Sequence, residues 1–134
     1  MDRWKIYLVM RPTSNRIDAG MRGLHLIVDM YGCGEDVLRD KNYIYNVLLE
    51  LPDYLKLTRL SEPFVEEYDN PSPGVSGFVI IGESHISIHT FVEDGLATVD
   101  VYACKEFNVE DAILYLTMKF SPERFQKHIL KRGD

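Results

Sequence analysis

Three strand patterns follow one another between residues 75 and 103, and only short turns separate them. Residues 75–81 are almost entirely apolar, residues 85–91 interleave Ser and His with β-branched side chains, and residues 96–103 alternate small apolar with polar residues. Gly82 lies in the first connection and Gly95 in the second. Connections this short join only antiparallel neighbours, so the sequence predicts a three-stranded antiparallel meander.

Further stretches on both sides of the meander show strand or helix periodicity. The expected elements are strands at 24–31, 55–60 and 125–131, helices at 43–51 and 109–120, and a loop at 61–74 that holds three of the six prolines. We expect Pro52 to end the first helix and Asn108 to cap the second. Together these elements predict an α+β fold, a two-layer sandwich in which two helices pack on one face of a mostly antiparallel sheet.

The length of the chain, 134 residues, suits one folded domain. The strand pattern starts just after Met21, so we divide the chain into an N-terminal extension at 1–20 and a domain at 21–134. Residues 4–9 of the extension read as one extra strand.

Charge and apolar content exclude several classes of partner. A net charge of -6 argues against nucleic acid and anionic membranes, because both select basic surfaces. No apolar run approaches the roughly 20 residues of a membrane span. Cys33 and Cys104 are the two cysteines, and the chain shows no export signal. We therefore expect free thiols and a cytoplasmic protein.

Two common kinds of site fit the sequence poorly. Ser84, His89 and Asp100 supply the residue types of a hydrolytic triad, but the residues around Ser84 lack the second glycine of a nucleophile elbow. A shared metal ion is also unexpected. His85 and His89 lie on one strand face, yet four residues at about 3.3 Å each separate them by roughly 13 Å. We therefore expect neither a serine hydrolase nor a metal site.

One constellation of polar residues surrounds the first turn of the meander. Glu83 and Ser84 form its tip, Ser76 lies eight residues before Ser84, His89 five after it and Cys104 twenty after it. The constellation resembles the self-cleavage site of the prokaryotic S-adenosylmethionine decarboxylase proenzymes. Similar motifs lie at 23–33 (Gly-Leu-His-Leu-Ile-Val-Asp-Met-Tyr-Gly-Cys), 74–77 (Gly-Val-Ser-Gly) and 100–104 (Asp-Val-Tyr-Ala-Cys). The likeness runs from about Met21 to the C-terminus.

This resemblance implies that the chain cuts itself between Glu83, the cleavage-site residue, and Ser84. In the family, the serine hydroxyl attacks the preceding carbonyl, an upstream serine matched by Ser76 assists, and a histidine matched by His89 removes the serine α-proton. The serine becomes a pyruvoyl group, which forms a Schiff base with the substrate amine and accepts electrons as CO₂ leaves. The cysteine matched by Cys104 then donates a proton to the carbanion.

The resemblance also implies a small-molecule substrate, S-adenosylmethionine, and a homodimer with sites near the subunit interface. Glu93 matches a carboxylate suited to ribose hydroxyls, and Phe64 or Tyr68 would stack on adenine. The sequence departs from the family at Leu24 and Lys105, and its loop before Gly74 is different. Two alternatives therefore remain. One is arginine decarboxylation by the same fold, and the other is a non-catalytic paralogue that dimerises with an active homologue.

Turn length predicts how the site is divided. If the first turn is tight, residues whose numbers sum to about 165 face each other, so Ser76 lies opposite His89. Seven residues then separate this pair from the tip of the turn, roughly 20 Å at the rise of a strand. We therefore expect the pair to act on Ser84 of a second chain, which gives two composite sites in a two-fold dimer.

Overall fold

The computed structural model describes residues 22–133, so the predicted extension at 1–20, with its strand at 4–9, lies outside the described residues. In chain order the elements are β1 (Gly23–Tyr31), α2 (Glu35–Leu38), α3 (Lys41–Tyr54), β2 (Phe64–Tyr68), β3 (Gly74–Ile81), β4 (Ser84–Phe91), β5 (Leu96–Ala103), α4 (Val109–Phe120) and β6 (Arg124–Arg132).

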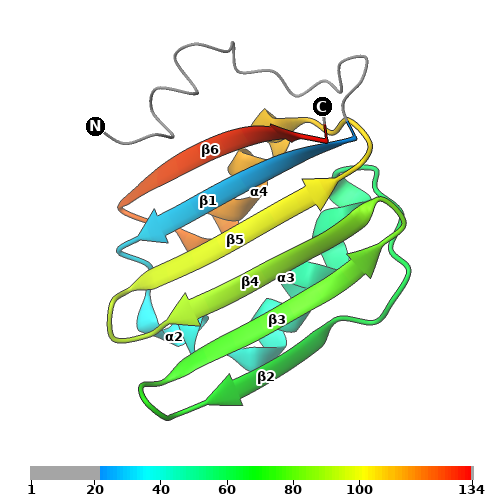
Figure 1. Ribbon diagram of the computed structural model, residues 1–134. Helices are drawn as coiled ribbons and strands as arrows, with labels where there is room; N and C mark the ends of the chain where they lie inside the picture. The colour runs from blue at the N-terminus through cyan, green and yellow to red at the C-terminus, as the bar shows by residue number, and fades with distance from the viewer. Residues whose placement is uncertain (1–21, 134) are drawn as a thin grey trace.

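The strands form one six-stranded sheet in the order β2-β3-β4-β5-β1-β6, and each neighbouring pair is antiparallel. The predicted meander is therefore confirmed as β3, β4 and β5. The helices lie together behind the sheet in Figure 1, which confirms the two-layer α+β sandwich. The single turn of α2 was not predicted; it lies between β1 and α3.

The core lies between the sheet and the helices and follows the predicted periodicities. One face of β1 and one stripe of α4 are buried; these residues are Leu24, Leu26, Val28, Met30, Val109, Ile113, Leu116 and Phe120. Burying a side chain of this size contributes about 1.5–3 kcal/mol. The predicted cap of α4 is confirmed, because the Asn108 side chain accepts a hydrogen bond from the Asp111 N–H at 2.9 Å.

Three of the elements predicted between residues 43 and 74 differ from the structure, and the first two lie around the end of α3. Helix α3 runs past Pro52 to Tyr54, because the Leu55 N–H bonds the Leu51 carbonyl at 3.0 Å and resumes the ladder beyond the proline. The predicted strand at 55–60 is absent. Lys56 has a φ of 60° and the Leu57 N–H returns to the Pro52 carbonyl at 2.8 Å, so this backbone closes the helix end.

The predicted loop at 61–74 contains strand β2 instead. Val65 is buried there, whereas its neighbours Phe64 and Glu66 are exposed. Phe64 pairs with Phe78 of β3. β3 is the only neighbour of β2 in the strand order among the described residues, so β2 is an edge strand of the sheet. A short strand with two glutamates carries too little apolar alternation to be recognised before its partner is known.

A buried threonine connects the two layers. Thr90 of β4 is fully buried, and its hydroxyl donates to the Leu38 carbonyl at 2.7 Å. The same oxygen accepts from the Val75 N–H at 2.9 Å. One side chain thereby satisfies backbone groups at the end of α2 and at the start of β3.

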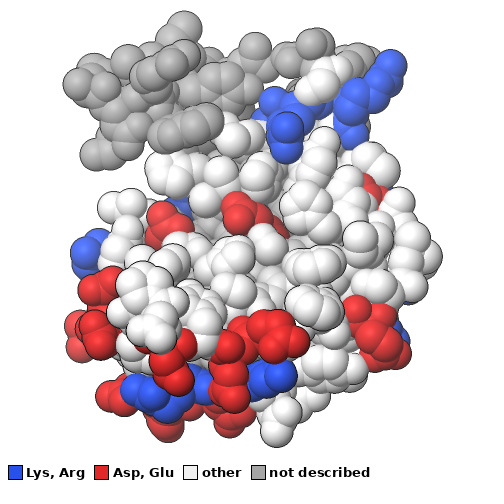
Figure 2. All heavy atoms as spheres, turned by 60° about the horizontal axis from the view of Figure 1, so that its bottom comes forward, with Lys and Arg blue, Asp and Glu red and all other residues white. Residues whose placement is uncertain are grey.

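No element in the described part of the chain covers the second face of the sheet, here called the open face. It exposes Phe64, Phe78 and Ile80, each more than two-fifths accessible. With the β2 edge turned forward, Figure 2 shows mostly uncharged surface across the middle of the view and carboxylates gathered along its lower border. None of the described helices is long and apolar enough to cross a membrane.

Candidate active site

The predicted cleavage bond lies in the turn between β3 and β4. Ile81 pairs with Ser84, so Gly82 and Glu83 alone form the turn and Ser84 opens β4. Ser84 is half-buried, and its φ of 157° is positive, a backbone conformation that is uncommon for a residue other than glycine.

Cys104 lies next to the same bond because of the register of β5. Ser84 pairs with Ala103, and the Cys104 N–H donates to the Glu83 carbonyl at 2.8 Å. That carbonyl belongs to the Glu83–Ser84 peptide, so a backbone donor already points at the oxygen that would become negative during attack. The Cys104 side chain is exposed. The structure thus brings Glu83, Ser84 and Cys104 together.

Ser76 and His89 form a second group on the open face. They pair in register, which confirms the prediction from turn length, and His89 Nδ1 lies 2.9 Å from Ser76 Oγ. His89 follows Ser84 by five positions along β4, about 17 Å at strand rise. One chain therefore does not bring this pair to its own Ser84.

An acidic residue that we considered only for a hydrolytic triad organises the middle of the open face. Asp100 Oδ1 lies 3.1 Å from His25 Nε2, and Asp100 Oδ2 accepts from Ser87 Oγ at 3.4 Å. The hydrogen bond to His25 holds the pKa of Asp100 below its ordinary value, and His89 lowers it further by charge. From the sequence, the alternation of β1 and β5 could have predicted that His25 and Asp100 lie on one face of the sheet. It could not have predicted that their side chains are in contact.

The two aromatic candidates for adenine lie in different hollows. Phe64 lines a hollow of about 280 Å³ together with Ser76, Phe78 and His89, and its ring centroid lies 5.8 Å from that of Phe78. Tyr68 is half-buried and lies outside this hollow; its hydroxyl donates to the Thr90 carbonyl at 3.4 Å. Of the two aromatic candidates, Phe64 is thus the one that lines the same hollow as Ser76 and His89.

Glu93 lies in the turn between β4 and β5, at the opposite end of β4 from Ser84. Its side chain is exposed and forms no hydrogen bond with any described residue. The structure therefore places Glu93 on the same side of Ser84 as His89, four positions beyond it along the chain.

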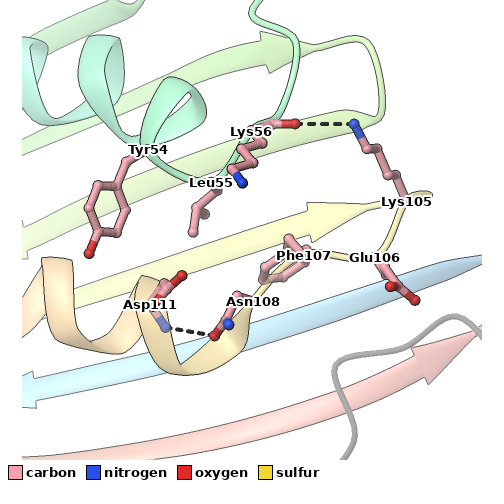
Figure 3. Close-up of a pocket in the computed structure, with 8 residues that line it drawn as sticks. All are labelled: Tyr54, Leu55, Lys56, Lys105, Glu106, Phe107, Asn108 and Asp111. Carbon is pink, nitrogen blue, oxygen red and sulfur yellow. Dashed lines mark hydrogen bonds between the residues drawn. The ribbon is translucent and has the colours of Figure 1, made fainter.

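A larger hollow of about 480 Å³ opens on the helix side, next to the loop after Cys104 (Figure 3). Its lining comes from the end of α3, the loop after β5 and the start of α4; the residues are Tyr54, Leu55, Lys56, Lys105, Glu106, Phe107, Asn108 and Asp111. The Lys105 ammonium donates to the Lys56 carbonyl at 3.1 Å and closes one wall. Among the described residues, no three of His, Cys, Asp and Glu are grouped as metal ligands.

Comparison with known proteins agrees with this geometry. Residues 24–133 match the family model described as S-adenosylmethionine decarboxylase. An S-adenosylmethionine decarboxylase proenzyme from Archaeoglobus fulgidus is 36% identical over 112 residues, which cover 83% of this chain and 97% of that protein. One from Aquifex aeolicus is 38% identical and covers 83% and 81%. The crystal structure of the adenosylmethionine decarboxylase from Aquifex aeolicus aligns with a TM-score of 0.75 and 34% identity, over 87% of this chain and 94% of that one.

Proposed function

The chain belongs to the S-adenosylmethionine decarboxylase family, and on this premise we propose that it cleaves itself between Glu83 and Ser84 and then decarboxylates S-adenosylmethionine. The observation that carries the proposal is the 2.8 Å hydrogen bond from the Cys104 N–H to the Glu83 carbonyl. It places a donor at the oxygen of the bond that must break, and the residue that supplies this donor also carries the thiol that the proposed reaction uses.

Self-cleavage begins within one chain. The Ser84 hydroxyl attacks the Glu83 carbonyl carbon, the new C–O bond forms, the C–N bond breaks, and the hydroxyl proton passes to the freed amine. The Cys104 N–H stabilises the oxygen that becomes negative. His89 then takes the α-proton at position 84, and the bond between the serine β-carbon and the ester oxygen breaks, which releases the Glu83 carboxylate. Water hydrolyses the unsaturated residue that is left, its nitrogen departs as ammonia, and the new chain starts at position 84 with a pyruvoyl group.

The residues present fit a pyruvoyl group at position 84. Ser84 supplies its three carbons at a half-buried strand end, and it pairs with Ala103, the residue before the exposed Cys104. Such a group supplies an electron sink for decarboxylation. Within that chemistry the Cys104 thiol holds the proton that is delivered to the substrate carbon after CO₂ leaves.

The complete site requires two copies of the chain. Ser76 and His89 lie about 17 Å from their own Ser84, and the open face that carries them is uncovered in the described part of the chain. We assign this face to a second copy, whose Ser84 then meets the pair. A two-fold dimer joined in this way holds two identical composite sites.

Substrate binding is assigned to the hollow on the open face. The exposed Phe64 ring stacks on adenine beside the serine–histidine pair, and we prefer it to Tyr68 because the Tyr68 hydroxyl bonds within the fold. Glu93 receives the ribose hydroxyls. Two unpaired cysteines, Cys33 and Cys104, support action in the cytoplasm.

Release of ¹⁴CO₂ from carboxyl-labelled substrates tests the assignment. S-adenosylmethionine and arginine are compared in parallel with the processed wild-type protein, and Ser84→Ala is the blank. We expect release from S-adenosylmethionine alone. Release from arginine alone would overturn the substrate. A processed chain that releases CO₂ from neither substrate, but raises the activity of an added homologue, would identify a non-catalytic partner.

A further inference from the structure

Hydrogen bonds join three loops around the acyl half of the Glu83–Ser84 bond. The Gly82 N–H donates to the Thr58 carbonyl at 2.7 Å, and the Thr58 N–H donates to Glu83 Oε1 at 3.0 Å. The Cys104 N–H donates to the Glu83 carbonyl at 2.8 Å. Glu83 is therefore held by its side chain on one loop and by its backbone on another.

The two outer loops are also linked to each other. The Lys105 ammonium donates to the Lys56 carbonyl at 3.1 Å, and Figure 3 shows Lys105 extended toward this oxygen. Residues 56–58, 82–83 and 104–105 thus form one connected arrangement, here called the clamp. Lys105 is a departure from the family pattern, and in this chain it connects the loop of Cys104 to that of Thr58.

On the amine half of the same bond the backbone of Ser84 is paired with Ile81 and Ala103, but its side chain lacks such restraint. Among the described residues, the Ser84 hydroxyl has no hydrogen-bond partner, although the residue is half-buried. It is free to rotate toward the Glu83 carbonyl carbon. The structure therefore fixes the group that is attacked and leaves the attacking group mobile.

We propose that the Glu83 carboxylate is a positioning residue for self-cleavage, and that it acts by binding the Thr58 N–H. This inference rests on the proposed self-cleavage and adds a role for the Glu83 side chain. The oxygen at the end of this side chain accepts the Thr58 N–H, and an amide oxygen in the same place can accept it too. This hydrogen bond holds the Glu83 carbonyl carbon in place for Ser84 and keeps its oxygen on the Cys104 N–H as negative charge develops.

Two substitutions of one residue separate positioning from general stability. Glu83→Leu keeps the size of the side chain and removes the acceptor. Glu83→Gln keeps an oxygen that accepts from the Thr58 N–H and removes the charge. Asp94→Leu is the matched control, because Asp94 is an exposed acid in the turn at the other end of β4 and its side chain bonds no described residue.

Cleavage is timed on gels after a short pulse of cell-free synthesis, and melting temperatures are measured on the same variants in a Ser84→Ala background. We expect Glu83→Leu to slow cleavage at least about tenfold, and Glu83→Gln and Asp94→Leu to stay within about threefold of wild type, with similar melting temperatures for all. Wild-type speed in Glu83→Leu would overturn the proposal, and so would a Glu83→Gln chain as slow as Glu83→Leu. A wild-type chain that never cleaves would instead refute the proposed function.

Discussion

Two variants that cannot process should repair one another if the site is shared between two copies of the chain. Ser84→Ala lacks the nucleophile, and His89→Ala lacks the base. Within one chain these residues lie about 17 Å apart along β4, whereas proton transfer needs a separation near 3 Å. A mixed dimer places the intact Ser84 of one chain beside the intact His89 of the other.

The expected yield follows from two-fold symmetry. Equal amounts that assort at random give roughly half mixed dimers, and each mixed dimer holds one competent site and one dead site. About half of all the His89→Ala chains should therefore be cut, which means every one in a purified mixed dimer, and none of the Ser84→Ala chains.

The assay is co-expression of the two variants with different affinity tags, followed by sequential purification of mixed dimers and a gel for the cleaved fragments. His89→Ala alone is the control. It should stall after the acyl shift, and hydroxylamine should then cut it at position 84, because esters react faster than amides. Mixed dimers that are purified but stay uncut would refute the composite site and require processing within one chain.

Three further substitutions test single parts of the structure. Cys104→Ala should still cleave but lose most ¹⁴CO₂ release per processed chain, and full activity would remove its role as proton donor. Thr90→Val leaves the Val75 N–H and the Leu38 carbonyl without their buried partner, so urea unfolding should show a loss of about 2 kcal/mol or more; a loss below about 0.5 kcal/mol would contradict this. The pKa of Asp100 in the folded state lies below its ordinary value of 3.8, so folding favours the ionised carboxylate. The resulting stabilisation is complete above pH 3.8. It disappears as the pH falls through the folded-state pKa. Asp100→Asn should therefore be less stable than wild type at pH 7 and approach it below pH 3.8, and a difference independent of pH would be the contrary result.

The sequence was most informative where periodicity and turn length act together. Two-residue alternation with a tight turn after Ile81 determines which residues of β3 and β4 face each other, and Ser76 and His89 lie where this predicts. The helix α4 was equally predictable, because Asn108 marks its start and apolar spacing marks its buried stripe.

The errors lie where tertiary contacts decide the backbone. Leu55 and Leu57 alternate as in a strand, but both are buried at the end of α3, which their local sequence does not reveal. The hydrogen bond between Glu83 and Thr58 joins residues 25 positions apart through two irregular segments. No periodic pattern encodes such a contact, so the sequence identified Glu83 as the cleavage-site residue but gave its side chain no part in the process.

Mass spectrometry of the purified wild-type protein tests the central claim most directly. Self-cleavage predicts two fragments, one ending at Glu83 with a free carboxylate and one starting at position 84 with a pyruvoyl group in place of serine, while Ser84→Ala stays one chain. A wild-type protein that keeps the intact mass of the 134-residue chain after prolonged incubation would contradict the claim.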